Sequence, residues 1–504
     1  MDNQKLLRWS NWARALAGVG LGVASGLLFM LAFPPYELWP LVFVGWVPML
    51  VAQFWLMPPK WSAVPSALAI GVWLQGYLGP VFAPVGTFMV WLPLIAAGLT
   101  FLTDQGLRVF NQQTRFRWFV PAGLANWAGS EMIRLFLPIA GSWAFIAYPL
   151  YRQVWLIQPV SVFGIIGMGV LVMLVNYTAA LALLGWLNQR WQWQEEPRII
   201  IPAGLVKKWL LALAGALAAW VLLSLALLRP AQGELVRVAA VQPEISPIIT
   251  ANQGLDEQVA QVHQQMLAQT HQAADEGARL VVWPEGSYLW DPQKEDRLNL
   301  AGLADDRNIY LASGYVVVEE AGLRNEATVI NPQGEFMGVF GKDHPVVFGG
   351  ETSLTRGTYP VYDTPLGKMG TIICYDLDYT DTARKLARAG AQLIAVPSND
   401  WGAIAEKHYA HVVFRAVENR VAMIKADGGY DSAIIDPYGR IAALASYPQG
   451  GEATLVADVQ AGSGKGTLTT RLGDWVGWLA LAGMVFFSFA GGWLVKQANK
   501  NVQE

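Results

Sequence analysis

Charged residues and cysteine are both scarce in this sequence. Charged residues make up 14% of its 504 residues, against roughly 25% in an ordinary soluble chain, while hydrophobic residues reach 54%. A water-soluble globule of this size would lack the polar residues needed to cover its surface. The formal net charge of −3 leaves no basic excess to neutralise phosphates, so nucleic acid is excluded as a partner.

The sequence holds a single cysteine, Cys374. It cannot form a disulfide within the chain, and a cysteine-ligated zinc site would need further cysteines. Its thiol is therefore either a small buried apolar group or a group that performs chemistry.

Eight stretches are long and apolar enough to cross a bilayer, whose hydrocarbon core of about 30 Å needs about 20 residues at 1.5 Å each. They span residues 12–33, 38–57, 64–82, 85–103, 118–137, 159–187, 208–228 and 475–495. We therefore predict a membrane α-helical bundle of about eight spans. Residues 1–230 would hold seven helices, residues 231–463 a polar domain, and residues 464–504 the closing segment with the eighth helix and a cytoplasmic tail.

Lysine and arginine are distributed unevenly over the short loops. With the N-terminus in the cytoplasm, the inner segments carry most of them: Lys5, Arg8, Arg14, Lys60, Arg108, Arg115, Arg117, Arg190, Arg198, Lys207, Lys208, Lys496 and Lys500. The outer loops before the polar domain carry little beyond Arg152. Positive charge marks the cytoplasmic side, so we expect a multi-pass protein of the cell (inner) membrane, with its polar domain on the extracytoplasmic or periplasmic side.

Glu131 and Arg134 lie at helical spacing inside an otherwise apolar segment. Charges at membrane depth are costly and mark a cavity or a buried pair. Either an ion pair that fixes helix packing or the lining of a lipid head-group site would explain them, and both interpretations stay open.

The polar domain alternates strand-like and helix-like segments, which favours an α/β fold with a buried sheet. Three residues with chemically useful side chains follow or flank its strands: Glu285, Lys342 and Cys374. Each alone has an ordinary structural explanation. Together they form a mechanism, because a thiolate nucleophile needs a base, and an ammonium stabilises the oxyanion that forms on the attacked carbonyl.

These residues carry a family resemblance. The segments 283–286 (Trp-Pro-Glu-Gly) and 373–377 (Ile-Cys-Tyr-Asp-Leu), with Lys342 between them, resemble the nitrilase, or carbon–nitrogen hydrolase, superfamily. So do segments 397–401 (Pro-Ser-Asn-Asp-Trp) and 415–419 (Arg-Ala-Val-Glu-Asn). The resemblance implies an αββα sandwich and a triad of Glu285, Lys342 and Cys374.

The segments on either side of the polar domain narrow the resemblance to the apolipoprotein N-acyltransferase family. A nitrilase-like domain placed after seven spans and before one resembles that family. The segments 31–35 (Leu-Ala-Phe-Pro-Pro) and 470–475 (Thr-Arg-Leu-Gly-Asp-Trp), and the pair Glu131 and Arg134, are also similar to its motifs. The resemblance covers nearly the whole chain.

Three departures from the family pattern concern residues around the triad. Asp376 follows Tyr375 where the family usually has Glu, and the loop after residue 241 lacks the usual Trp. The family's second Glu falls on Gly350, one residue before Glu351. A bulge at the glycine pair 349–350 would carry Glu351 into that place, because glycine tolerates positive φ. Alternatively, Glu351 is solvated and Asp376 is the candidate for the missing carboxylate. We count Tyr375, Asp376 and Glu351 as substrate-binding or supporting candidates.

The resemblance implies transfer of a fatty acyl group from a membrane phospholipid, through a Cys374 thioester, to the N-terminal amine of a lipidated lipoprotein. It implies no cofactor, and we expect a monomer. His408 and His411 lie three residues apart on a predicted helix, but without further ligand-type neighbours we predict no metal there. Two alternatives remain: a membrane-tethered nitrilase-like amidase that hydrolyses a carbon–nitrogen bond, and a non-catalytic binding module, which the intact triad disfavours.

Overall fold

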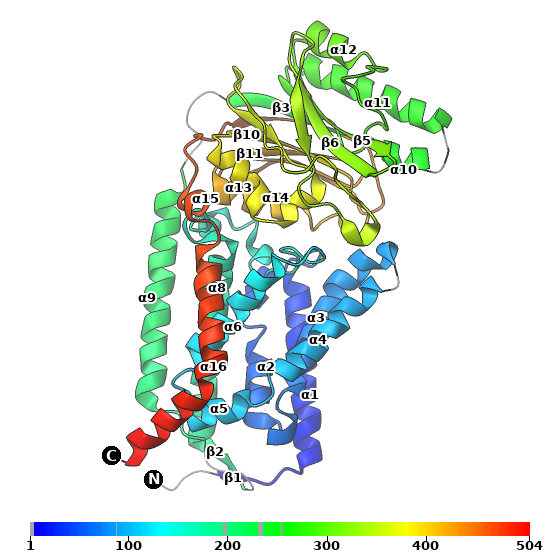
Figure 1. Ribbon diagram of the computed structural model, residues 1–504. Helices are drawn as coiled ribbons and strands as arrows, with labels where there is room; N and C mark the ends of the chain where they lie inside the picture. The colour runs from blue at the N-terminus through cyan, green and yellow to red at the C-terminus, as the bar shows by residue number, and fades with distance from the viewer. Residues whose placement is uncertain are drawn as a thin grey trace.

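The computed structural model describes residues 5–86, 88–194, 199–229, 235–252, 254 and 256–503. The expected boundary between residues 230 and 231, and Arg198, lie outside these residues. The molecule has a helical bundle and, at one end of it, an α/β domain (Figure 1). The first and the last described residues lie at the end of the bundle that faces away from the domain (Figure 1).

The bundle is built from ten helices of the described residues and one short strand pair. The helices are α1 (Asn11–Ala32), α2 (Val47–Val51), α3 (Val64–Phe82), α4 (Leu92–Thr103), α5 (Leu107–Gln113), α6 (Phe119–Arg134), α7 (Val154–Ile157), α8 (Val160–Arg190), α9 (Ala203–Leu227) and α16 (Trp475–Gln503). The strands β1 (Lys5–Leu7) and β2 (Trp191–Trp193) pair in parallel near the chain ends.

Seven helical segments of the described residues are long and apolar enough to cross a membrane. They are Asn11–Ala32, Trp39–Leu56, Pro59–Val85, Met89–Gln113, Val160–Arg190, Ala203–Leu227 and Trp475–Gln497. The protein is therefore a multi-pass membrane protein, as predicted, and these segments correspond to seven of the eight expected spans.

The expected span over residues 118–137 is the one that differs. There the chain forms α6, whose 16 residues reach only about 24 Å, because the chain leaves the helix in turns after Arg134. Gly129 of α6 and Gly477 and Gly483 of α16 bring these two helices into close contact, as small residues do between membrane helices. Thus α6 is a shorter helix that packs within the bundle against α16.

The domain contains two six-stranded sheets. One has the order β14-β3-β4-β5-β6-β7 and the other β13-β12-β11-β10-β9-β8. The strands are β3 (Leu235–Gln242), β4 (Leu280–Val282), β5 (Tyr310–Glu319), β6 (Gly322–Ile330), β7 (Phe336–Gly341), β8 (Val361–Tyr362), β9 (Met369–Thr371), β10 (Leu393–Ser398), β11 (Ala422–Asp427), β12 (Asp431–Ile435), β13 (Ile441–Ser446) and β14 (Ala453–Gln460).

Helices cover the outer faces of the two sheets, so the domain has four layers. The helices are α10 (Pro247–Asn252), α11 (Asp256–Asp275), α12 (Leu300–Arg307), α13 (Asp381–Arg388), α14 (Tyr409–Asn419) and α15 (Leu468–Leu472). Small and β-branched residues such as Val238, Val282 and Ile424 fill the space between the sheets. The α13 and α14 layer faces the bundle (Figure 1), and its apolar core continues into the bundle core. The predicted αββα sandwich is confirmed.

Strand direction decides where side chains gather in this domain. Strands β3, β4 and β5 are parallel to one another, and so are β9, β10 and β11. The carboxyl ends of parallel strands meet at one edge of a sheet, where such folds place their ligands. Glu285 follows β4 and Cys374 follows β9, so both lie at such an edge.

Candidate active site

Glu285 and Lys342 form a buried pair. Lys342 comes directly after β7, and its Nζ donates a hydrogen bond to Glu285 Oε1 at 2.8 Å. Both side chains are almost fully buried. A buried ammonium is stable only beside compensating carboxylates, which ties these two residues to one place.

Cys374 opens a short 3₁₀ helix, η8 (Cys374–Asp378). Its φ of 43° lies in the left-handed region, which costs a non-glycine residue of order 1–3 kcal/mol and clusters at functional sites. The thiol is buried, and the charges of both Glu285 and Lys342 act on it. The structure therefore gathers all three residues of the predicted triad in one region.

Glu351 also reaches Lys342. Gly350 adopts the left-handed conformation (φ 80°), and the next residue turns its carboxylate inward. Glu351 Oε2 accepts from Lys342 Nζ at 2.9 Å and from the Val346 backbone N–H at 2.8 Å. The lysine ammonium is thus held between two carboxylates, and Glu351 is not a solvated surface acid.

Asn325 completes this cluster and was not anticipated. Its side-chain amide on β6 donates to both Glu285 Oε1 and Glu351 Oε1. In the sequence, Asn325 stands out only as a polar residue that precedes the buried part of a strand. Many residues with purely structural roles share this feature.

Burial and close charges shift the pKa values of this cluster. Burial raises the pKa of Glu285, the Lys342 ammonium opposes the rise, and Glu351 adds to it. Burial alone would lower the pKa of Lys342, but Glu285 and Glu351 outweigh it and raise that pKa well above its usual value. Burial, with the charges of Glu285 and Asp400, raises the pKa of the Cys374 thiol well above its usual value, while Lys342 lowers it. The resting cysteine is therefore a thiol that needs a base.

Asp376 supports the loop that carries Lys342. Its carboxylate accepts backbone N–H groups from Ile373 at 2.9 Å, Asp343 at 3.1 Å and His344 at 2.8 Å. Burial raises the pKa of Asp376 to about 7, although the charge on His344 opposes this. These bonds join η8 to the residues after Lys342, so they fix the thiol relative to the ammonium.

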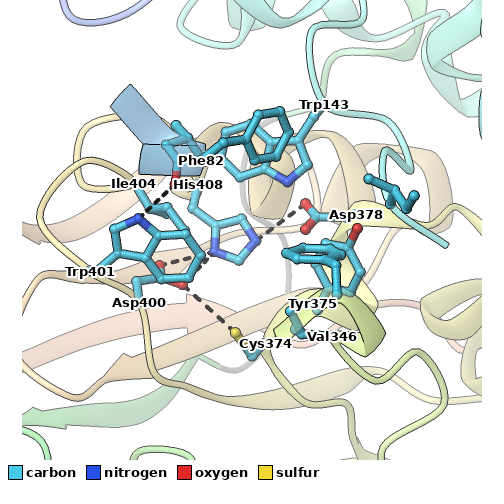
Figure 2. A pocket seen from close by; sticks show the side chains of 13 residues that line it. Phe82, Trp143, Val346, Cys374, Tyr375, Asp378, Asp400, Trp401, Ile404 and His408 are labelled. Carbon is cyan, nitrogen blue, oxygen red and sulfur yellow. Dashed lines mark hydrogen bonds and ion pairs between the residues drawn. The ribbon is translucent and has the colours of Figure 1, made fainter. Parts of the chain in front are cut away.

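A mainly apolar cavity opens beside Cys374 (Figure 2). Both parts of the molecule line it. The bundle and its loops contribute Val81, Phe82, Ile139 and Trp143, and the domain contributes Val346, Phe348, Cys374, Tyr375, Asp378, Asp400, Trp401, Ile404 and His408. Trp401 Nε1 donates to the Val81 carbonyl at 3.1 Å, which joins the two walls. Tyr375 lies on the domain wall, and its hydroxyl donates to the Pro138 carbonyl at 3.4 Å.

The intramembrane charges Glu131 and Arg134 hold one of these walls in place. Glu131 accepts from Trp127 Nε1 at 3.2 Å and from the Ile146 backbone N–H at 3.0 Å. Arg134 donates to the Trp143 carbonyl at 3.0 Å and lies 3.8 Å from Glu131. These contacts favour the packing interpretation over a head-group site.

Two histidines of the domain, His408 on the cavity wall and His411 behind it, approach one carboxylate. His408 Nε2 lies 3.4 Å and His411 Nδ1 2.5 Å from Asp378 Oδ1, and all three side chains are buried. Asp378 is the ligand-type neighbour of these histidines that the sequence did not reveal, and the ligand atoms of the three residues lie within 4.8 Å of one another, close enough to hold a metal ion. That no metal binds here stays a prediction.

Two family models match the chain. A carbon-nitrogen hydrolase model matches residues 237–467, and a model of the apolipoprotein N-acyltransferase N-terminal domain matches residues 25–178. The first corresponds to the α/β domain and the second to much of the bundle.

Named relatives match over most of the chain. The apolipoprotein N-acyltransferase of Geobacter metallireducens is 26% identical over 507 residues, which cover 92% of this chain and 93% of that protein. The apolipoprotein N-acyltransferase of Gloeobacter violaceus is 26% identical over 519 residues and 92% of each chain. Human omega-amidase NIT2 is 26% identical over only 37% of this chain.

Among solved structures, a Nesterenkonia amidase of the nitrilase superfamily covers 45% of this chain and 92% of its own, with 20% identity and a TM-score of 0.37. The acyltransferase relatives cover 92% of this chain, whereas human omega-amidase NIT2 covers 37% of it. The chain therefore belongs to the apolipoprotein N-acyltransferase family, a membrane-embedded branch of the nitrilase superfamily.

Proposed function

We propose that the protein transfers a fatty acyl group from a membrane phospholipid to the N-terminal amine of a lipidated lipoprotein, with Cys374 as the nucleophile. The observation that carries this proposal is the position of a buried thiol on a cavity whose other wall comes from the membrane bundle. Such a cavity suits an acyl chain that enters from the bilayer. A soluble amidase has no such wall.

In the first half-reaction, Glu285 takes the proton from Cys374, and the thiolate attacks the ester carbonyl carbon. The ammonium of Lys342 stabilises the oxyanion. The intermediate then collapses, the ester C–O bond breaks, and the lysophospholipid leaves with the proton that Glu285 returns. An acyl thioester remains on Cys374.

In the second half-reaction, the amine of the acceptor attacks the thioester carbonyl. Glu285 takes a proton from the nitrogen, the C–S bond breaks, and the thiolate of Cys374 is reprotonated by Glu285. An amide leaves and the resting enzyme returns. Glu351 would keep Lys342 charged and oriented in both steps, because the ammonium donates to it at 2.9 Å.

The amidase alternative shares the same triad. Asp376, where the family usually has Glu, is the feature that favours it, but its carboxylate bonds to backbone N–H groups, which is a supporting role in either reaction. Complementation of a bacterial strain that lacks its own acyltransferase separates the two. Mass spectrometry should find N-acylated lipoprotein N-termini in the complemented strain, and unacylated N-termini with active cleavage of small amides would favour the amidase.

We propose further that the domain faces away from the cytoplasm and works as a monomer. The arginine and lysine asymmetry of the loops supports the first point. Reporter fusions after Arg229 and after Lys496 should report opposite sides of the membrane. If both report the cytoplasm, the proposed topology is wrong.

A further inference from the structure

A second polar cluster touches the thiol, built from residues that the proposed chemistry does not use. Cys374 Sγ donates to Asp400 Oδ1 at 3.7 Å. Asp400 follows β10, and both of its carboxylate oxygens lie 3.0 Å from His408 Nδ1 (Figure 2). The thiol hydrogen is thus directed at Asp400, while the proposed base is Glu285.

Asp400 is ionised, because two cations hold its carboxylate. Lys425 Nζ donates to Asp400 Oδ2 at 2.7 Å, and His408 pairs with it from the cavity wall. Burial would raise the pKa of Asp400, but His408 and Lys425 hold it well below its usual range. A carboxylate in this state accepts the thiol hydrogen and does not act as a base.

His408, the residue before α14, is charged, and His411, in the first turn of that helix, is neutral. Burial would lower the pKa of His408, but Asp400 and Asp378 raise it to about 10. Burial lowers the pKa of His411 to about 4, although Asp378 opposes this. Trp143 of the bundle loop stacks on His408 at 5.8 Å between ring centroids, which keeps water from this imidazolium.

We propose that Asp400 and His408 are a positioning pair for Cys374. Asp400 accepts the thiol hydrogen and fixes Sγ on the cavity wall. The imidazolium of His408 offsets the negative charge of Asp400, so that the thiolate can form when Glu285 takes the proton. This inference rests on the proposed nucleophile and adds how its reactivity is set.

The charges around each group determine the direction in which each substitution should shift the pKa of the Cys374 thiol. Cys374 is faced by Glu285, Lys342 and Asp400. Asp400 is faced by His408 and Lys425, with Asp427 and Asp431 acting across Lys425. His408 is faced by Asp400, Asp378 and the neutral His411. Removing the Asp400 charge should favour the thiolate, and removing the His408 charge should disfavour it.

The test is the pH dependence of iodoacetamide alkylation in the full-length protein in lipid nanodiscs, followed by intact mass. Because Cys374 is the only cysteine, a single adduct reports its thiolate. Asp400→Asn should lower the midpoint by about one pH unit, which is roughly a tenfold faster reaction at a pH below both midpoints. His408→Gln should raise the midpoint by a similar amount, since Lys425 still keeps Asp400 ionised.

His411→Gln is the matched control, because it changes a neighbouring buried histidine that carries no charge. Its midpoint should stay at the wild-type value. Equal shifts in His408→Gln and His411→Gln, or shifts of the same sign in Asp400→Asn and His408→Gln, would overturn the proposal. Asp400→Asn also removes a partner of buried Lys425 and could fail to fold for that reason. In that case the proposal is tested by the difference in alkylation midpoint between His408→Gln and His411→Gln. Alkylation needs no acyl donor, so these results stand apart from success or failure of the proposed acyl transfer.

Discussion

The two walls of the cavity beside Cys374 come from different parts of the chain and differ in chemistry. The domain wall holds the thiol and the charged residues Asp400 and His408, whereas the bundle wall is apolar, with Val81, Phe82 and Ile139 among its residues. The first wall is fixed by ion pairs and strand ends. The second is fixed by helix packing and by hydrogen bonds to loop carbonyls.

We expect the two walls to have different roles in the reaction. The domain side carries the proposed nucleophile and the charged groups that position it, so their loss should act on the chemical step. Groups on the bundle side contact the substrate without reacting, so their loss should act on binding, which appears in KM. Substitutions on the two walls should therefore give distinguishable kinetic signatures.

The largest effect is expected on the domain side, at the nucleophile. Cys374→Ser should leave a folded protein with no measurable acyl transfer, because a serine hydroxyl beside a carboxylate base is far less nucleophilic than a thiol. Turnover measured with a phospholipid donor and a lipopeptide acceptor checks this, with thermal unfolding as the control for folding. Near-normal turnover would remove Cys374 from the mechanism.

The next effect is expected at the ammonium. Lys342→Ala should lower kcat/KM by about 100- to 1,000-fold, the ~2.7–4 kcal/mol that one oxyanion-hole donor contributes. It should also slow alkylation of Cys374, since Lys342 lowers the pKa of that thiol. The same two measurements on the exposed residue Lys294 changed to Ala give the control. An unchanged alkylation rate in Lys342→Ala would contradict contact between its charge and the thiol.

Glu351 should matter less than the triad and more than the bundle wall. Glu351→Ala should cut turnover at least ~100-fold, within the range of general acid–base residues, because Lys342 and Asn325 both lose a carboxylate partner. Glu335→Ala, which changes a glutamate bonded only to its own turn, is the matched control. A loss below about threefold would place Glu351 outside the working site.

The smallest effect is expected on the bundle wall. Ile139→Ala should raise the KM for a long-chain phospholipid by roughly 10-fold, the lower end of what a lost methylene-sized contact contributes in a hydrophobic pocket. Its kcat and its Cys374 alkylation profile should stay unchanged. The control is Ile133→Ala, which changes a residue of α6 outside the cavity lining. This variant should leave both KM and kcat unchanged. A selective loss of kcat in Ile139→Ala would break the division between the two walls.

The same division explains what could be predicted from the sequence. Glu285 and Cys374 could be predicted as site residues because they follow apolar strands, and Lys342 because the superfamily resemblance places it. Glu351 could be predicted from the glycine pair before it. The roles of Asp400 and His408 could not be predicted, because a polar residue after a strand and a histidine near a helix have many structural explanations. Their roles depend on a three-dimensional contact with Cys374.

The bundle wall could not be predicted for a different reason. Apolar residues are everywhere in residues 1–230, so composition does not distinguish Phe82 or Ile139 from residues that face lipid. The length of α6 was also missed, because hydropathy continues through residues 135–137 after the helix has ended. Both cases depend on where the chain turns, which an apolar sequence does not indicate.

The central claim is that Cys374 carries the acyl group, and the intact mass of the protein tests it most directly. After incubation with phospholipid vesicles and no acceptor, the wild-type chain should gain the mass of one acyl group on its only cysteine, and an amine acceptor should remove it. Glu285→Gln, which keeps the shape of the side chain without its proton acceptor, should gain no such mass. Acyl transfer that proceeds without any acyl adduct in the wild type, or an adduct that forms equally fast in Glu285→Gln, would contradict the account.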